Sequence, residues 1–193
     1  MRASFNDDYS HYKGHIEIWK YYTDGRKELH YEDQNVVCSG MGATKATAFA
    51  ASGGADIRNF QITLFQMGTA GNAGLQVSSN GKLGTPLTAS EYGAGILGIV
   101  TQNLSASGTI HTNQAFAVIP TAFIDKVSDR KCRWRLVLDE NAGNSLSVNE
   151  VGLFSKNPIE TNPATAFLCA YRYFTALAKT NEYALHIIWT IQF

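Results

Sequence analysis

Charged residues are scarce in this sequence, and neither sign predominates. They make up 17% of the 193 residues, and 16 basic residues balance 16 acidic ones, whereas globular domains contain about 25%. Without an overall positive field, the chain lacks the long-range attraction that draws proteins to nucleic acid, so direct binding to DNA or RNA is not expected. A neutral, sparsely charged surface opposes association only weakly. This composition is compatible with permanent assembly and with a low-charge monomer.

Paired cysteines, long apolar runs and a secretion leader are also missing. Cys38, Cys132 and Cys169 are widely spaced and form no C-x-x-C motif, which predicts free, buried thiols. No apolar run approaches the roughly 18 residues that a membrane helix needs, so no contact with a membrane is expected. The opening stretch, MRASFNDDYSHYKG, is polar and lacks the apolar core of a signal peptide. We therefore expect folding in a reducing cytoplasm.

No motif for catalysis, a metal or a cofactor is present. His11 and His15 are four residues apart, but Gly14 separates them and the segment leads into a predicted strand. The glycine-rich segment 68–74 follows a predicted strand, yet no helix start follows it, as a phosphate-binding loop would require. Nucleophile-elbow, zinc-protease and Walker motifs do not occur. The sequence predicts no catalytic residue, no cofactor and no metal ligand.

Two charged segments remain as weaker candidates. Asp139-Glu140 precedes a turn and is the carboxylate pair that a small β-fold hydrolase would use. Residues 125–135 are rich in Lys and Arg, which is compatible with a nucleic-acid stripe. Acidic residues interrupt that run, however, so the solvated or partner-facing side of a strand is the favoured interpretation. His186 is expected to be a structural histidine.

Alternating apolar residues predict a mainly β protein. Two alternating runs flank Asp24-Gly25, which is typical of a hairpin. Further strands are expected within 58–68, 95–104, 115–124, 132–140, 145–155 and 166–174. In the first of these, Phe60, Ile62 and Leu64 are expected on one face. The last predicted strand has the strongest pattern, and its expected core-facing residues are Tyr183, Leu185, Ile187, Trp189, Ile191 and Phe193.

One helix and one long excursion interrupt this pattern. Alanines between 43 and 51 predict a short helix near residues 40–52, with Ser39 as a cap and Gly53-Gly54 at its end. Residues 69–113 are rich in Gly, Ser, Thr and Ala and contain only two charges, Lys82 and Glu91. The sequence thus predicts a single domain over 1–193, an antiparallel, jelly-roll-like β-sandwich with 69–113 as an inserted loop or hairpin. We expect this insertion to reach a neighbouring subunit.

Several segments occur in an order that resembles structural proteins of tailed bacteriophages. After the hairpin, QNVVCSGMG (34–42) leads to FQITLFQMGTAG (60–71), and N-E-V-G-L-F (149–154) comes later. The final segments are R-Y-F (172–174), K-T (179–180) and the L-x-I-x-W-x-I strand that begins at Leu185. The resemblance covers both ends of the chain and omits most of 75–125.

The resemblance implies a virion component without catalytic activity, located in a head decoration, a neck or collar, or a tail fibre or baseplate. It also implies assembly in the host cytoplasm. The expected partners are copies of the chain in a trimer or higher symmetric assembly, together with other virion proteins. The alternative is a carbohydrate-binding module for host glycans, for which Trp19 is the tryptophan left outside the predicted core. A small β-fold enzyme is the third possibility.

Overall fold

The computed structural model describes residues 12–50, 60–76, 81–93, 98–157 and 165–193. Its strands are β1 (Lys13–Tyr22), β2 (Lys27–Val37), β3 (Ile62–Gly68), β4 (Ile99–Ala106), β5 (Thr109–Val118), β6 (Ile124–Ser128), β7 (Lys131–Leu138), β8 (Ser147–Asn157), β9 (Thr165–Ala178) and β10 (Tyr183–Gln192). The helical elements are α1 (Ser39–Ala50), α2 (Ala89–Tyr92) and the 3-10 turn η4 (Thr121–Phe123). The prediction of a mainly β protein with one short helix is confirmed. The expected helix end at Gly53-Gly54 and the residue His11 lie outside the described residues.

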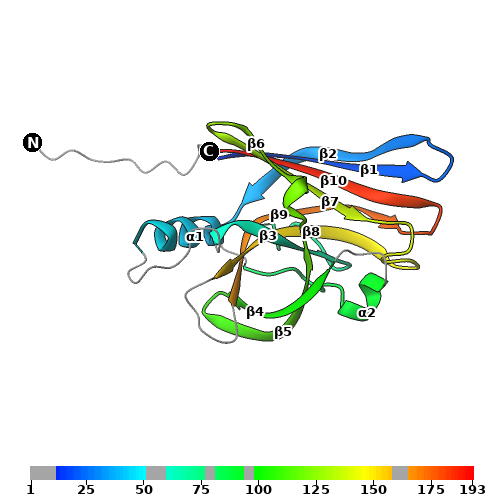
Figure 1. Ribbon diagram of the computed structural model, residues 1–193. Helices are drawn as coiled ribbons and strands as arrows, with labels where there is room; N and C mark the ends of the chain where they lie inside the picture. Colours follow the sequence, from blue (N-terminus) through cyan, green and yellow to red (C-terminus); the bar gives the residue numbers. More distant parts are fainter. Residues whose placement is uncertain (1–11, 51–59, 77–80, 94–97, 158–164) are drawn as a thin grey trace, which may run out of the picture.

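The strands form one sheet that closes on itself at one end. Their order is β4-β5-β3-β8-β9-β2-β1-β10-β7-β6. β4 also pairs in parallel with β9, through Asn103–Thr165 and Leu104–Ala166, so that the first five strands form a closed barrel. The other five strands lie as a layer over one side of the barrel (Figure 1). This arrangement replaces the expected jelly-roll-like pair of separate sheets, because β2 continues from the layer into the barrel and pairs there with β9.

Strands β3, β8 and β9 are buried on both faces. Leu153 and Phe65 pack toward the layer, in a core that contains Trp189. Phe154 packs into the barrel, where its ring meets that of Phe116 edge-on at 5.1 Å. A single set of strands therefore supplies one wall to each of two hydrophobic cores.

Ile62 and Leu64 were expected on one face of strand β3, but a bulge between them places them on opposite faces. Ile62 belongs to the core beneath the layer, whereas Leu64 belongs to the core of the barrel. The pairing of β3 with β8 shifts register between these two residues. Since a bulge adds a residue to one strand, residues two apart no longer share a face.

The last strand lies in the middle of the layer, as its pattern predicts. β10 pairs with β1 in unbroken register from Tyr183–Tyr22 to Gln192–Lys13, and with β7 on its other side. Its residues alternate between buried and half-buried as far as Ile191, and Gln192 is exposed. Phe193 also packs against the core beneath the layer, but it is only half-buried and lies beside α1.

Glu150 holds two loop segments against the barrel. Its side chain is fully buried, and its carboxylate accepts hydrogen bonds from the backbone N–H groups of Gly84 (2.9 Å), Thr85 (2.9 Å) and Ala70 (3.3 Å). The hydroxyl of Tyr171 donates a fourth, at 2.9 Å. A buried carboxylate is tolerated when donors surround it in this way.

The neighbouring Asn149 binds the same region through a single glycine. Its side-chain amide donates to the carbonyl of Gly71 (3.0 Å) and accepts from the N–H of Gly71 (2.8 Å). A Cβ atom at position 71 would lie 2.6 Å from Cβ of Glu150, so a side chain there would push the segment away. The first two residues of the N-E-V-G-L-F motif therefore position the beginning of the 69–113 region.

Lys179 is the buried cation of the K-T motif. It is 1% exposed, and its ammonium donates to the carbonyl of Thr180 (2.8 Å), Oδ1 of Asn144 (3.1 Å) and the carbonyl of Glu140 (3.4 Å). Burial lowers the pKa of Lys179 to about 8, and the carboxylates of Asp139 and Glu140 oppose this shift. These bonds join the β7–β8 connection to the β9–β10 turn.

The first prediction concerns the buried carboxylate. Glu150→Gln keeps the size of the side chain but directs an NH₂ group at donors, so the free energy of unfolding should fall by about 3 kcal/mol. Urea titration measures this loss. The matched change Glu182→Gln, at an exposed position in the β9–β10 turn, should alter stability by less than about 0.5 kcal/mol. Equal stability of the two variants would contradict the proposed role of Glu150.

The second prediction concerns pH. The pKa of Lys179 is about 8 in the folded protein and 10.5 ordinarily, so the unfolded chain binds more protons between these values. Stability should therefore rise with pH across this interval. Relative to Lys179→Met, the wild-type free energy of unfolding should gain about 1.5 kcal/mol between roughly pH 8 and 9.5. If the free energy of unfolding changed with pH in the same way in both proteins, or fell in the wild type relative to the variant, the lowered pKa of Lys179 would be refuted.

Candidate functional site

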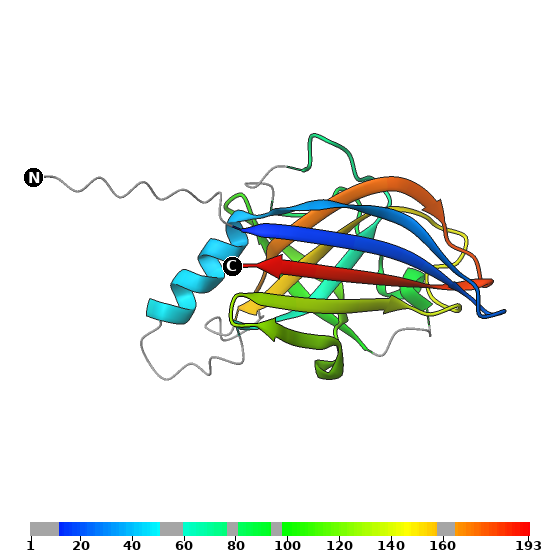
Figure 2. The same ribbon diagram turned by 90° about the horizontal axis from the view of Figure 1, so that it is seen from above.

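Helix α1 lies across the end of the β body where β10 also ends (Figure 2). One side of the helix is fixed to β9. Gly40 has no side chain, which allows the helix to approach the carbonyl of Leu168. One turn later, the buried hydroxyl of Thr44 lies 2.7 Å from Oγ of Ser155 and 3.7 Å from Sγ of Cys169. Two small residues of the helix, Gly40 and Thr44, thus permit its close contact with the barrel.

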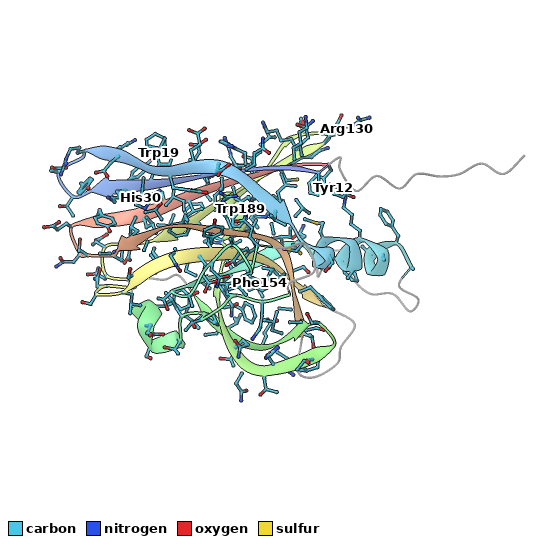
Figure 3. All side chains as sticks on the ribbon, turned by 180° about the vertical axis from the view of Figure 1, so that it is seen from behind. Tyr12, Trp19, His30, Arg130, Phe154 and Trp189 are labelled. Atoms are coloured by element: carbon cyan, nitrogen blue, oxygen red, sulfur yellow. The ribbon has the colours of Figure 1, made fainter. Side chains whose placement is uncertain are left out.

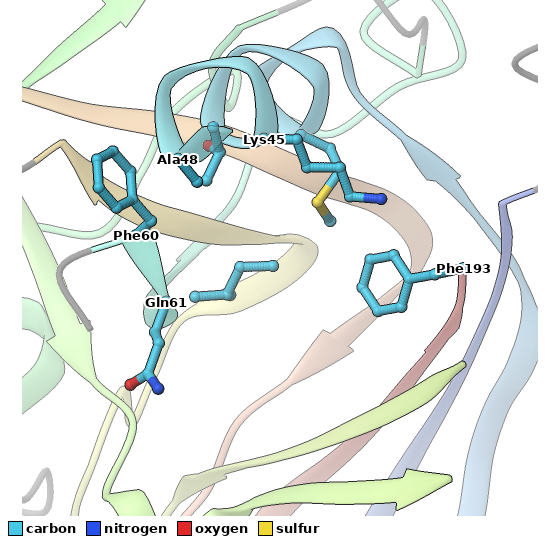
Figure 4. A pocket seen from close by; sticks show the side chains of 8 residues that line it. Lys45, Ala48, Phe60, Gln61 and Phe193 are labelled. Atoms are coloured by element: carbon cyan, nitrogen blue, oxygen red, sulfur yellow. The ribbon is translucent and has the colours of Figure 1, made fainter. Parts of the chain in front are cut away.

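Two hollows flank the attached side of the helix. The larger has a volume of about 570 Å³ and lies at the junction of β2 and α1, where Val37, Cys38 and Tyr12 line it. The smaller, which we name the α1 groove, has a volume of about 260 Å³ (Figure 4). Its lining residues are Met41, Thr44, Lys45, Ala48, Phe60, Gln61, Ile62 and Phe193. Apart from Gln61, Lys45 and Thr44, these are apolar side chains.

Lys45 and Phe193 form one rim of the α1 groove, and both contact Tyr12, which lines the larger hollow. The ammonium of Lys45 donates to the hydroxyl of Tyr12 at 2.8 Å. It also lies 4.2 Å from the ring centroid of Tyr12 and 4.4 Å from that of Phe193, and the two rings meet edge-on at 6.0 Å. Cation–π contacts of this kind hold the lysine stem in place. The rim is therefore an ordered feature that connects α1 to the last residue of the chain.

Phe49 stands out on the same helix. Its side chain is 90% exposed, the largest value among the exposed large hydrophobic residues in the described part of the chain. Its neighbour Ala48 lines the α1 groove. Exposed apolar surface beside an apolar hollow is typical of an interaction site, so this end of the molecule is the candidate functional surface.

A second surface lies on the outer face of the layer. Trp19 lies on this face, whereas Trp189 lies between the layers and Phe154 lies within the barrel (Figure 3). The indole of Trp19 donates to the carboxylate of Glu17 at 2.8 Å. The ring of Tyr21 stacks on His186 with centroids 4.1 Å apart. We name Trp19, Tyr21 and His186 the outer aromatic face.

The other histidines and carboxylates of the described residues lie in separate places on the structure. His15 lies near Glu17 (3.5 Å) and Glu32 (3.3 Å), and the described residues contain no cluster of three potential metal ligands. Burial, together with Lys27, lowers the pKa of His186. The Asp139-Glu140 pair lies in the connection that Lys179 holds, where Asp139 accepts a hydrogen bond from the N–H of Asn141.

The basic run and the glycine-rich segment also have structural explanations. In segment 125–135, Asp125 accepts from the guanidinium of Arg133 (3.0 Å), and Asp129 accepts from Lys126 (2.9 Å). These acidic partners reduce the positive field that a nucleic-acid stripe requires. The 68–74 segment is held by Asn149 and Glu150, as described above.

The cysteines are free, as the spacing predicts, but they differ in burial. Cys38 and Cys169 are buried, whereas Cys132 is only half-buried. Burial raises the pKa of Cys38 to about 12 and also raises that of Cys169. Thiols with raised pKa values are poor nucleophiles at neutral pH, so both buried cysteines act as packing residues.

Sequence reasoning missed the α1 groove and Phe49. A phenylalanine within an alanine-rich helix resembles a core residue, and only the direction of its side chain shows otherwise. The groove itself is formed by segments far apart in the sequence, from α1, from the start of β3 and from the last residue.

No helix in the described part of the chain is both long and apolar enough to cross a membrane. Comparisons with protein-family models, with curated proteins and with solved structures give no match to this chain.

Proposed function

We propose that this protein is a non-enzymatic structural component of a bacteriophage virion that works through contacts between subunits. The observation that carries the proposal is the exposed apolar end of the molecule, where Phe49 projects beside the α1 groove. Covering such a surface with another protein is favourable, since it removes apolar area from water. A neutral chain with 17% charged residues adds little repulsion between copies.

The residues of the phage-like pattern support the proposal through their structural roles. Asn149 and Glu150 hold loop segments against the barrel, and Lys179 joins two connections at one end of it. A motif composed of residues that fix loops suits a rigid building element. Its place is a head decoration, a neck or collar, or a tail fibre or baseplate, within a particle assembled in the host cytoplasm. Its partners are copies of itself, in a trimer or higher symmetric assembly, and other virion proteins.

A second candidate function is carbohydrate binding during host attachment, which the outer aromatic face favours. Trp19 and the stacked pair of Tyr21 and His186 offer flat apolar surfaces beside the carboxylate of Glu17. This combination of aromatic surface and hydrogen-bonding groups is typical of ligand sites. Quenching of Trp19 fluorescence by a host glycan, and its loss in Trp19→Ala, would favour this function over the first.

The third prediction follows from the proposed function. Light scattering on the purified chain should give a mass at least three times the 21.1 kDa of one copy, and the mass should fall on dilution. A mass of one copy at every concentration tested would contradict a function based on contacts between copies.

A further inference from the structure

The α1 groove has room for one aromatic ring. Its volume is about 260 Å³, whereas an apolar protein cavity of about 150 Å³ is enough to bind benzene. Met41, Phe60 and Phe193 supply much of its apolar wall. An aromatic side chain is thus the kind of group that this groove fits.

The chain's own Phe49 does not fill the groove. Consecutive residues on a helix point about 100° apart, because a turn contains 3.6 residues. Ala48 lines the groove and Phe49, the next residue, is 90% exposed. The chain thus carries an exposed aromatic side chain beside a hollow of matching size. Within one copy, the side chain does not fill the hollow.

We infer that Phe49 of one copy inserts into the α1 groove of a second copy. This inference rests on the proposed function and names the contact through which copies associate. The contact is self-complementary, since every copy has both the projection and the hollow. Because the two lie at the same end of the molecule, a symmetric arrangement around that end allows each copy to insert its ring and to receive one.

Charge and rigidity favour a second copy as the occupant. Helix α1 has no acidic residue, and its one lysine, Lys45, already lies over the rings of Tyr12 and Phe193. Helix α1 itself therefore brings no carboxylate that would be buried without a partner in such a contact. An entering phenyl ring would also meet the ammonium of Lys45 at the rim, a favourable cation–π arrangement.

The helix that carries the projection is also firmly attached. Gly40 lies against β9, and the hydroxyl of Thr44 is hydrogen-bonded to Ser155 of β8, so little conformational freedom of the backbone is lost on contact. Aromatic residues that are held rigidly and enter a desolvated pocket contribute most of the affinity in protein interfaces.

Two complementary variants test this inference. Phe49→Asp removes the projection and leaves the groove, whereas Ala48→Trp fills the groove and leaves the projection. Each variant alone should associate at least about tenfold more weakly than wild type, the effect expected for an interface hot spot. Mixed in equal amounts, the two should form complexes that contain both variants, because one intact projection and one intact groove remain. Sedimentation with one variant fluorescently labelled measures the association of each variant alone and of the mixture.

Leu29→Asp is the matched control, since Leu29 is a partly exposed apolar residue on β2, outside the 69–113 region. It should associate as wild type does, and circular dichroism should confirm that every variant is folded. If Phe49→Asp associates as strongly as wild type, or if the mixture associates no better than the separate variants, this inference is overturned while the proposed function stands. A wild-type protein that remains a single copy at all concentrations overturns both.

Discussion

The structure depends on three strands that are buried on both faces. β3, β8 and β9 lie between the interior of the barrel and the covering layer, so one wall serves two hydrophobic cores. Trp134 of the layer adds a direct link, because its indole donates to the carbonyl of Ile62 at 3.0 Å. Each large apolar side chain buried in this wall contributes about 1.5–3 kcal/mol. The barrel and the layer therefore cannot separate without exposing the side chains that both share.

Buried polar groups add specificity to this apolar wall. Glu150 stands in β8 between Asn149 and Val151, and its four donors come from loops and from β9. Any alternative packing of the 68–71 and 84–85 segments would leave that carboxylate without partners, which is costly in an apolar interior. Lys179 would likewise lose its hydrogen-bond partners if the β9–β10 turn packed in another way. The two residues account physically for the N-E and K-T parts of the phage-like pattern.

Local patterns in the sequence predicted helix α1 and most strands, but they missed the short helix α2, and the strand expected over 115–124 is divided among β5, η4 and β6. Asp24-Gly25 forms the β1–β2 turn, with Gly25 at a φ of 87°, and the alternation of the last strand predicts its inward-facing residues. The barrel was not predictable, because its closure depends on the short β4–β9 pairing between residues about sixty positions apart. The role of Glu150 was not predictable for a related reason. Three of its partners are backbone N–H groups, which nearly every residue has, so the sequence does not identify them. The bulge in β3 and the outward direction of Phe49 depend on tertiary packing as well.

A rigid two-core body with one apolar end is suited to repeated assembly through that end. Hydrogen exchange, measured by mass spectrometry at low and at high protein concentration, tests this account most directly. The account predicts that a rise in concentration protects the amides of α1 and of the Phe60–Ile62 segment and leaves the outer aromatic face unchanged. Protection confined to the strands that carry Trp19 and His186, or no change with concentration, would contradict it.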